Sequence, residues 1–291
     1  MTRAFRRVAI LGHTERPAVR RTAARLAAQL ERRGHHVRFE AELAAHMRLD
    51  GAPLARLAPW CQAMISLGGD GTVLTAGRAL AGRRGVLLPV NLGGLGFLAA
   101  VEARDLDRAV RASFSGRWKV ATRRGVVARV RRGGRIVHRA FALNDAVVRS
   151  EASYAALHMR LTALGLDLGH LVADGLIAAS ASGSTAYSLS AGGPVLAPDV
   201  DALVVTPACP HSLGSRSLVL GPGSVVTVEV LGPGAALLVL DGQAPLALER
   251  HDVVELQRSQ SSVRVFENPD HPFLRALHAK LGWQGSKRRS L

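Results

Sequence analysis

The sequence predicts an α/β domain with a parallel sheet, followed by an all-β domain. Across residues 7–114, short apolar segments alternate with segments of helical spacing, which is typical of a parallel α/β sheet. From residue 120 onward, short β-rich segments dominate and Pro-Gly turns separate several of them. With 291 residues, the chain is long enough for two domains. We expect these domains to span residues 1–118 and 119–267, with a C-terminal helix within 268–291 that packs back on the first domain.

Four strands and three helices are predicted in the first domain. The helix at 18–33 is amphipathic, because apolar side chains recur on one face at helical spacing: Val19, Ala23, Leu26, Ala27 and Leu30. Gly34 is a suitable C-terminal stop for it. The other helical segments are 73–80 and 106–114, and the strands are expected at 7–11, 36–39, 61–67 and 86–90. The functional loops of such a sheet lie at the carboxyl ends of its strands.

The second domain is predicted to begin with a β-hairpin. Apolar segments at 126–130 and 136–141 flank Gly133 and Gly134, and this arrangement is a hairpin signal. Further strands are expected at 202–205, 225–231, 236–240, 253–256 and 263–266. Residues 272–281 then return to a helical pattern, and residues 284–291 are interpreted as a solvated basic end.

The composition is strongly basic, with a formal net charge of +16. Only three of the 38 basic residues are lysines, and the arginines are scattered along the chain. This distribution indicates a protein that attracts polyanionic small molecules such as nucleotides, and it argues against a nucleic-acid-binding protein. Aromatic residues make up only 4% of the chain, which leaves few platforms for stacking bases. We therefore expect no nucleic-acid partner.

The sequence also argues against a membrane protein. No apolar run reaches membrane-spanning length, and polar His13 and Thr14 interrupt the first apolar segment, which argues against a secretory signal. We expect a soluble cytoplasmic protein with no membrane partner. Cys61 and Cys209 lack metal-ligand spacing and are interpreted as reduced thiols. The sequence shows no cluster of histidine, cysteine and carboxylate residues that would suggest a structural metal.

The most informative motif is Gly68-Gly69-Asp70-Gly71-Thr72, which follows a predicted strand and opens a predicted helix. Glycines allow backbone amides to approach a phosphate closely, and the helix start adds favourable partial charge. A carboxylate in such a loop would repel phosphate, so Asp70 needs a role of its own. Proton abstraction from a hydroxyl, or metal binding, would supply that role. Taken alone, the motif is equally consistent with an ordinary strand-to-helix turn that has an aspartate cap.

Three further motifs consist mainly of small and polar residues. Asp174-Gly175 precedes the run from Gly183 to Pro194, in which Ser184 and Thr185 are suited to cap a short helix and Tyr187 to stack on a ring. Asn144-Asp145 follows a predicted strand, and a carboxylate there can hold two ribose hydroxyls. Asp241-Gly242-Gln243 ends another strand. Taken alone, the last two motifs are ordinary turns.

The order of these motifs resembles that of the NAD kinases, which phosphorylate the adenosine ribose 2′-hydroxyl of NAD. The resemblance runs from about Val8 to Trp283, and its second half rests on Pro207-Ala208-Cys209-Pro210-His211 as well as on the motifs above. In the first half it also includes Asn91-Leu92-Gly93 and Leu95-Gly96-Phe97-Leu98. The run from Gly183 to Pro194 is highly specific to this family, whereas the Asp70 motif is shared with diacylglycerol-type lipid kinases. The resemblance implies an NAD kinase-like architecture whose second domain is a β-sandwich.

The resemblance also implies roles for individual residues. Asp70 would act as general base on the ribose 2′-hydroxyl, in a loop where Gly69, Gly71 and Thr72 contact the nucleotide phosphates. Asp174 would contact the nicotinamide end, in this family often from a neighbouring subunit. The other implied residues would line the NAD pocket, Asn144 and Asp145 on its adenosine side: Asn144, Asp145, Ser184, Thr185, Ala186, Tyr187, Ser188, Ser190 and Gln243.

The implied reaction uses ATP or inorganic polyphosphate as phosphate donor, with Mg²⁺ bound to that donor. A homodimer or homotetramer is also implied. This chain departs from the family pattern at Asp145, where Glu is usual, and at Ser180-Ala181-Ser182, where Thr-Pro-Thr is common. Two alternatives stay open. One is a diacylglycerol-type lipid kinase, and the other is a dinucleotide-binding regulator without turnover.

Overall fold

The computed structural model describes residues 5–14, 16–93, 96–99, 101–152, 155–232 and 235–282. The chain divides into two compact units, Met1–Ala121 with Arg264–Leu291, and Thr122–Val263. Gly94 and Leu95 of the glycine-rich segment, Pro233 and Gly234 of a predicted turn, and the basic end at 284–291 lie outside the described residues.

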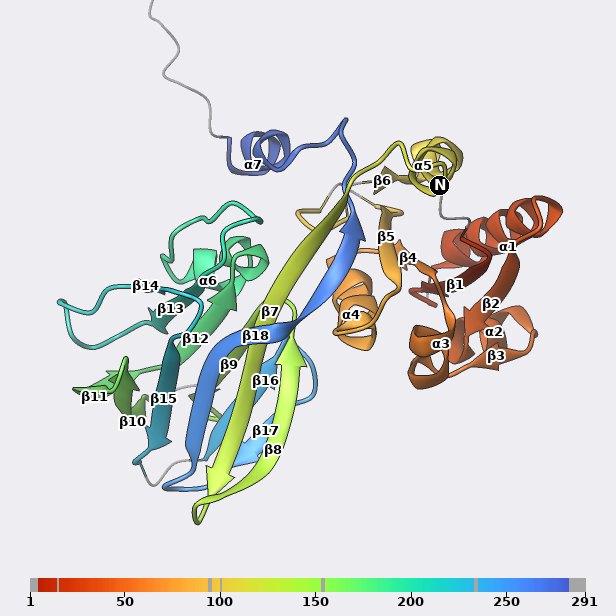
Figure 1. The fold of residues 1–291 in the computed structure, drawn as a ribbon. Helices are drawn as coiled ribbons and strands as arrows, with labels where there is room; N and C mark the ends of the chain where they lie inside the picture. Colours follow the sequence, from red (N-terminus) through yellow and green to blue (C-terminus); the bar gives the residue numbers. More distant parts are fainter. Residues whose placement is uncertain are drawn as a thin grey trace, which may run out of the picture. The chain divides into compact units, whose positions relative to one another are not determined.

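The first unit is built around a parallel sheet in which β1 occupies a central position (Figure 1). The strand order is β3-β2-β1-β4-β5, and β5 pairs on its other side with β6 and with the last residues of β18. Every one of these pairings is parallel. The strands are β1 (Arg7–Gly12), β2 (His36–Glu40), β3 (Gly51–Ala52), β4 (Ala63–Gly68), β5 (Val86–Asn91) and β6 (Val101–Glu102).

Helices cover both faces of this sheet (Figure 1). The helical elements of the unit are α1 (Pro17–Arg32), α2 (Ala41–Met47), α3 (Leu54–Trp60), α4 (Asp70–Leu80), η1 (Ala103–Asp105), α5 (Leu106–Phe114) and α7 (Phe273–Leu281). The five apolar residues predicted on one face of α1 are all buried, which confirms the spacing argument. Together with the apolar side of α5 they form one hydrophobic core with strand residues such as Ile10, Ile65 and Leu88.

The strand order places a topological switch point between β1 and β4. The chain runs from β1 outward through β2 and β3, and then returns to the other side of β1 with β4 and β5. In open parallel sheets, ligands bind at the carboxyl ends of the strands at such a point. The turn after β4, which contains Gly69 and Asp70, lies at this position.

Several short elements of the first unit were not predicted. The helices α2 and α3 have seven residues each, and α3 contains Pro59, so the sequence carries too few periodic positions to reveal them. The helix α3 ends at Trp60, Cys61 is its C-cap, and β4 begins only at Ala63, so Cys61 does not belong to the strand. The predicted helix at 73–80 begins earlier, at Asp70, because residues 70–72 form its first turn instead of a preceding loop.

The described strands of the second unit form two groups of six. One group belongs to a 12-stranded sheet and has the order β11-β10-β15-β18-β7-β8, and the other is a separate six-stranded sheet with the order β14-β13-β12-β9-β16-β17. The second sheet is antiparallel throughout, and so are the β11–β10–β15–β18 and β7–β8 pairings of the first. The first group comprises β7 (Val120–Arg132), β8 (Arg135–Ala142), β10 (Leu157–Ala163), β11 (Leu166–Ala173), β15 (Val225–Val230) and β18 (Val253–Phe266). The second comprises β9 (Asp145–Ser150), β12 (Gly175–Ser180), β13 (Leu203–Ala208), β14 (Leu218–Leu220), β16 (Ala236–Leu240) and β17 (Leu246–Leu248).

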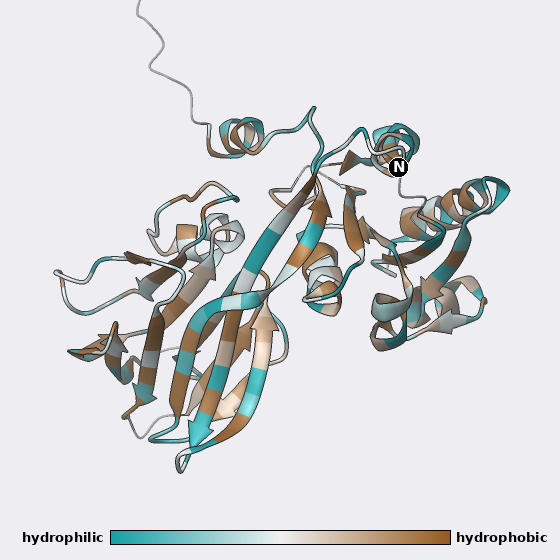
Figure 2. Cartoon of the chain, in the orientation of Figure 1, coloured by the Kyte–Doolittle hydropathy of each residue, from teal (hydrophilic) through white to brown (hydrophobic). Residues whose placement is uncertain are grey.

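One hydrophobic core joins the inner faces of these two sheets. Its buried residues come from strands of both, such as Val126 of β7 and Val228 of β15 in the first sheet, and Val148 of β9 and Ala178 of β12 in the second. Teal and brown bands alternate along β7 and β18 in Figure 2, as expected for strands with one buried and one solvated face. The predicted fold class, a parallel α/β domain followed by a β-sandwich, is therefore confirmed.

The predicted hairpin is confirmed, with strands longer than expected. The segments at 253–256 and 263–266 are parts of a single strand, β18, because the polar residues between them continue the strand. Strands β9 to β12, β14 and β17 were not predicted, and between β12 and β13 lie a 3-10 turn, η2 (Ser182–Thr185), and a short helix, α6 (Tyr187–Ser190). Within the described part of the chain, no helix has the length and apolar character needed to cross a membrane. Cys61 and Cys209 are free thiols.

Candidate active site

The glycine-rich motif of the first unit joins the end of β4 to the start of α4. Gly68 is the last residue of the strand, and a Cβ atom at this position would collide with the hydroxyl of Thr72. Around Gly69 and Gly71 the situation differs, since a Cβ atom at either residue would meet no other atom of the described residues within 4 Å. The backbone at these two glycines is therefore open to a ligand.

In the first turn of α4, two N–H groups are bonded within the turn, and those of Asp70 and Gly71 precede them. The N–H groups of Thr72 and Val73 both donate to the carbonyl of Gly69, at 3.0 and 3.3 Å. The first amides of a helix have no intrahelical acceptor, and the helix dipole adds partial positive charge at the same end. The arrangement is suited to an anion such as phosphate.

The Asp70 carboxylate does not cap its own helix, contrary to the simplest structural interpretation of the motif. It accepts hydrogen bonds from the N–H groups of Phe97 and Ala99, both at 3.3 Å. A side chain at Gly96 would collide with this carboxylate, so the segment passes Asp70 closely only because residue 96 is glycine. The two loops that follow β4 and β5 thus meet at Asp70, which is half-buried.

In the second unit, Asn144 and Asp145 form the turn from β8 to β9, here called the Asn144-Asp145 turn. The carboxylate of Asp241 accepts hydrogen bonds from three consecutive N–H groups of this turn: Leu143 at 2.8 Å, Asn144 at 2.7 Å and Asp145 at 3.3 Å. From the other side, Ser180 N–H donates to the carbonyl of Asn144 at 2.8 Å, and its hydroxyl donates to the carbonyl of Leu143 at 2.7 Å. The turn is therefore fixed by two elements at once.

Two carboxylates are buried at this turn, Asp145 with 5% and Asp241 with 6% of its surface exposed. Burial raises the pKa of Asp145 to about 7, and the negative charge of Asp241 contributes to this rise. A hydrogen bond from the backbone of Tyr187 acts in the opposite direction. Near neutral pH, the Asp145 carboxyl is thus close to its titration midpoint.

The side-chain amide of Asn144 is also buried, with 8% of the residue exposed. Its Oδ1 atom has no hydrogen-bond partner among the described residues. Buried polar atoms of native proteins nearly always have a partner, so an unpartnered one needs an explanation. A bound molecule with a suitable donor is one such explanation.

The serine-rich run after β12 lies against this turn. Gly183 permits the contact, because a Cβ atom there would collide with the carbonyl of Asn144. The Ser184 hydroxyl donates to the carbonyl of Ala181 at 2.7 Å and accepts from Leu196 N–H at 3.0 Å. The Ser188 hydroxyl is 2.9 Å from that of Thr206. Both serines are fully buried, so their hydroxyls hold the run itself in place.

The other predicted residues of the run are more accessible. Thr185 and Ala186 are half-buried, and Tyr187 and Ser190 are exposed. The ring of Tyr187, at 48% exposure, is available to stack on a ligand. Its backbone contacts Asp145, which joins the run to the Asn144-Asp145 turn.

Gln243 lies in the turn that begins with Asp241, whereas the structure separates Asp174 from the cluster. Gln243 is exposed and lies two residues after Asp241, with its N–H bonded to the carbonyl of Leu240 at 3.0 Å. Asp174 precedes the first residue of β12, whereas Ser180, which contacts Asn144, is its last. A strand of this length extends over about 20 Å. Within one chain, Asp174 and the Asn144-Asp145 turn therefore lie at opposite ends of β12.

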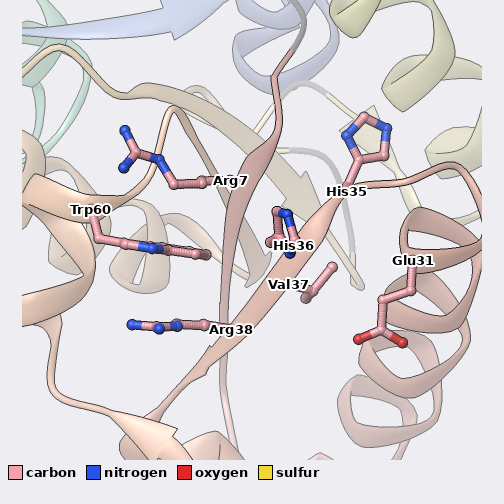
Figure 3. Close-up of a pocket in the computed structure, with 7 residues that line it drawn as sticks. All are labelled: Arg7, Glu31, His35, His36, Val37, Arg38 and Trp60. Carbon is pink, nitrogen blue, oxygen red and sulfur yellow. The ribbon is translucent and has the colours of Figure 1, made fainter.

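A cavity of about 420 Å³ lies elsewhere in the first unit (Figure 3). Its lining residues are Arg7, Glu31, His35, His36, Val37, Arg38 and Trp60. Arg7 and His36 are the first residues of β1 and β2, so the cavity lies at the amino ends of these strands. Asp70 follows the carboxyl end of β4. Because β4 runs parallel to β1, the cavity and Asp70 lie at opposite edges of the sheet.

Comparison with known proteins identifies the family. The model of the ATP-NAD kinase N-terminal domain matches residues 8–118, and that of the ATP-NAD kinase C-terminal domain matches residues 143–268. The NAD kinase of Burkholderia lata is 34% identical over 282 residues, which cover 96% of this chain and 94% of the relative. The chain belongs to the NAD kinase family. The NAD kinase of Desulforamulus reducens is 39% identical over 237 residues, 81% of this chain and 82% of the relative.

Solved structures show the same fold. Yeast NADH kinase, solved in complex with NADH, has a TM-score of 0.90 and 23% identity, covering 99% of this chain and 91% of its own. An NAD kinase from Archaeoglobus fulgidus, solved in complex with ATP, has a TM-score of 0.77 and 22% identity, covering 96% of this chain and all of its own. The sequence-based assignment to the NAD kinases is therefore confirmed.

Asp241 has two features that the sequence did not reveal. It belongs to a recognised motif, but its three bonds to the Asn144-Asp145 turn join residues almost a hundred positions apart. Its backbone is left-handed, with φ of 50°, a conformation that aspartate tolerates better than most residues. An Asp-Gly pair at the end of a strand is the only sequence signal for either feature.

Proposed function

We propose that this NAD kinase transfers a phosphoryl group from ATP to the 2′-hydroxyl of the adenosine ribose of NAD. The observation that carries the assignment of the acceptor is the Asn144-Asp145 turn. Its buried amide oxygen lacks a partner among the described residues, and a buried carboxyl group lies next to it. Adenine offers an amino group to such an oxygen, and an ionised carboxylate accepts from two ribose hydroxyls.

Residues next to the Asn144-Asp145 turn would form the rest of the proposed NAD pocket. Tyr187, Thr185 and Ala186 would line it with accessible atoms, and Ser190 and Gln243 would border it. The two buried serines of the run would act by holding its backbone, since the hydroxyls of Ser184 and Ser188 are already bonded within the protein. Buried, fully bonded polar groups of this kind make a site rigid, which favours binding.

Asp70 is the proposed general base. The 2′-hydroxyl oxygen attacks the γ-phosphorus of ATP and forms the new O–P bond, while the bond between this phosphorus and the β–γ bridging oxygen breaks. The hydroxyl proton passes to the Asp70 carboxylate, and ADP leaves with the bridging oxygen. The hydrogen bonds from Phe97 and Ala99 would fix the carboxylate in one orientation during this step.

The donor phosphates would bind at the start of α4, against the open backbone of Gly69 and Gly71 and beside Thr72. Mg²⁺ would arrive as part of the Mg·ATP substrate, where it neutralises phosphate charge. Among the described residues, no group of three histidine, cysteine or carboxylate side chains is placed to hold a metal ion.

The experiment is an acceptor and donor panel with the purified protein. NAD, NADH and diacylglycerol would each be incubated with Mg·ATP, and NAD also with Mg²⁺ and polyphosphate. We expect NADP from NAD and ATP. Phosphorylation of diacylglycerol alone would support a lipid kinase, and NAD binding without any NADP would support a regulator without turnover. Either result would contradict the proposed reaction.

We also propose that the enzyme works as a homodimer or homotetramer in which Asp174 serves the pocket of a neighbouring subunit. The distance along β12 supports this, because Asp174 lies at the wrong end of the strand to reach the Asn144-Asp145 turn of its own chain. Light scattering at assay concentration tests the oligomeric state. A fully active monomer would contradict the proposal.

A further inference from the structure

Three consecutive N–H groups at the Asn144-Asp145 turn, where β9 begins, need hydrogen-bond acceptors. One buried side chain accepts all three: Asp241, through Oδ2 to Leu143 and through Oδ1 to Asn144 and Asp145. The backbone N–H of Asp241 in turn donates to the carbonyl of Asp145 at 2.9 Å. The two segments are thus joined by four hydrogen bonds in both directions.

We infer that Asp241 is a positioning residue that holds the Asn144-Asp145 turn in its NAD-binding conformation and thereby sets the affinity for NAD. The inference rests on the proposed function, because it assigns Asp241 to the adenosine side of the same pocket. Asp241 is buried beneath the turn, with 6% of its surface exposed, and its carboxylate oxygens are occupied by backbone N–H groups. It therefore acts through Asn144 and Asp145 and does not itself touch NAD.

The backbone at Asp241 adopts an unfavourable conformation that places its carboxylate against the Asn144-Asp145 turn. Asp241 and Gly242 both adopt left-handed conformations, with φ of 50° and 66°. A non-glycine residue in this region costs free energy that the surroundings must offset. The conformation aims the short carboxylate back at residues 143–145. Asparagine would direct an NH₂ group at backbone donors, and glutamate would be one methylene too long for the same three contacts.

Asp241 also acts on Asp145 through its charge. Both carboxyl groups are withdrawn from water, and the negative charge of Asp241 adds to the effect of burial on the pKa of Asp145. The groups that act on Asp145 are Asp241 from the end of β16 and the backbone of Tyr187 from α6. Ionised Asp145 accepts from two ribose hydroxyls, whereas the protonated form keeps one oxygen for its own proton. Asp241 therefore also governs the pH at which the pocket binds NAD well.

The test compares Asp241→Asn with Asp252→Asn. Asp252 is a matched control in the same unit, since it is 1% exposed and its carboxylate also accepts a backbone N–H, that of Glu249 at 2.9 Å. It lies in the turn before β18, where its carboxylate bonds to Arg132 instead of a residue of the pocket. Both variants lose part of a buried network, so both are expected to be less stable than wild type.

Only Asp241→Asn is expected to change NAD binding. We expect its KM for NAD to rise roughly tenfold or more while its KM for ATP changes less than about twofold. The reason is that the variant weakens only the hydrogen bonds that hold the Asn144-Asp145 turn. The pH midpoint of NAD affinity should fall, since Asp145 loses its charged neighbour. An NAD KM and pH midpoint equal to those of Asp252→Asn would overturn the inference.

Hydrogen exchange in the wild-type protein provides a measurement that needs no variant. The N–H groups of Leu143 and Asn144 donate to Asp241, so they should exchange as slowly as those of the adjoining strand β9. Exchange as fast as in exposed turns would overturn the inference even if Asp241→Asn does not fold. A wild-type protein that forms no NADP would instead refute the proposed function, while slow exchange at these amides would still show that Asp241 holds the turn.

Discussion

At the scale of single residues, the Asn144-Asp145 turn contains two buried polar groups that cost folding free energy. The Asn144 amide oxygen is buried without a partner among the described residues, and the Asp145 carboxyl is buried next to Asp241. Both are costly in the free protein, because buried polar groups without full compensation destabilise a fold. A ligand with an amino group and paired hydroxyls would satisfy both, so the proposed NAD site predicts that NAD affinity and stability are linked at this turn.

Replacement of Asn144 by alanine separates these two effects. We expect Asn144→Ala to raise the KM for NAD roughly tenfold, which is the effect of one lost hydrogen bond in a desolvated site. Because the amide oxygen has no protein partner among the described residues, the free protein should keep its Tm or gain slightly. Steady-state kinetics and thermal unfolding measure the two quantities. A large loss of Tm with unchanged KM would show that Asn144 is structural.

The pH dependence of stability tests the state of Asp145. Its pKa rises from 3.8 to about 7 on folding, so the folded protein retains the proton where the unfolded chain has lost it. The stability contributed by this group is thus complete below pH 3.8 and is lost as the pH rises through about 7. Denaturant unfolding of the NAD-free protein from about pH 4 to about pH 7 should show this decline, and Asp145→Asn should reduce it. An unchanged slope in the variant would contradict the assignment.

Local pattern predicted the Asp70 turn, because strand, glycines and helix follow one another in the sequence. It did not predict what the Asp70 carboxylate contacts, since Phe97 and Ala99 lie 27 and 29 positions away. The same holds for Asp241, whose partners are set by the pairing of β16 with β9. The tertiary structure determines which polar side chains contact each other. The spacing of motifs along the sequence does not show these contacts.

At the scale of elements, the first turn of α4 combines a weak helix former with an open surface. Gly71 lies in the helix, and a Cβ atom there would meet no other atom within 4 Å in the part of the chain that the structure describes. Alanine favours helix over glycine by roughly 0.5–1 kcal/mol. A glycine at this position therefore reduces helix stability, and the proposed access for the donor phosphates would compensate for this loss.

Gly71→Ala should consequently make the protein more stable and less active. We expect a higher Tm, together with a KM for ATP raised several-fold and a KM for NAD close to that of wild type. Gly68→Ala is the contrasting variant, because its Cβ would collide with Thr72 and should lower the Tm. If Gly71→Ala bound ATP as well as wild type, the donor phosphates would not lie against this turn.

Elements with a clear apolar pattern were predictable and the others were not. The helix α1 follows from its apolar spacing, and the strand β16 follows from its continuous apolar run. The helices α2 and α3 were missed, because seven residues contain barely two turns of pattern. The strand β18 was divided in two, since its middle residues are polar and their pairing is visible only in the sheet.

At the scale of the whole molecule, the net charge of +16 acts on every anionic substrate. Such a charge attracts nucleotides over distances comparable to the Debye length, which is about 8 Å at physiological ionic strength. We expect kcat/KM for NAD and ATP to fall as salt is raised from low to physiological concentration, with kcat nearly unchanged. Kinetics at constant pH with a monovalent salt measure this. Salt-independent values would show that the excess of arginine does not contribute to substrate capture.

The central claim is that Asp70 removes the proton of the ribose hydroxyl while other residues bind NAD. It is tested most directly by measuring NAD binding and NADP formation with the same preparation of Asp70→Asn. We predict calorimetric NAD affinity within about twofold of wild type and turnover reduced by roughly 10²–10⁴-fold, the usual contribution of a general base. Turnover equal to that of wild type at unchanged affinity would contradict the claim.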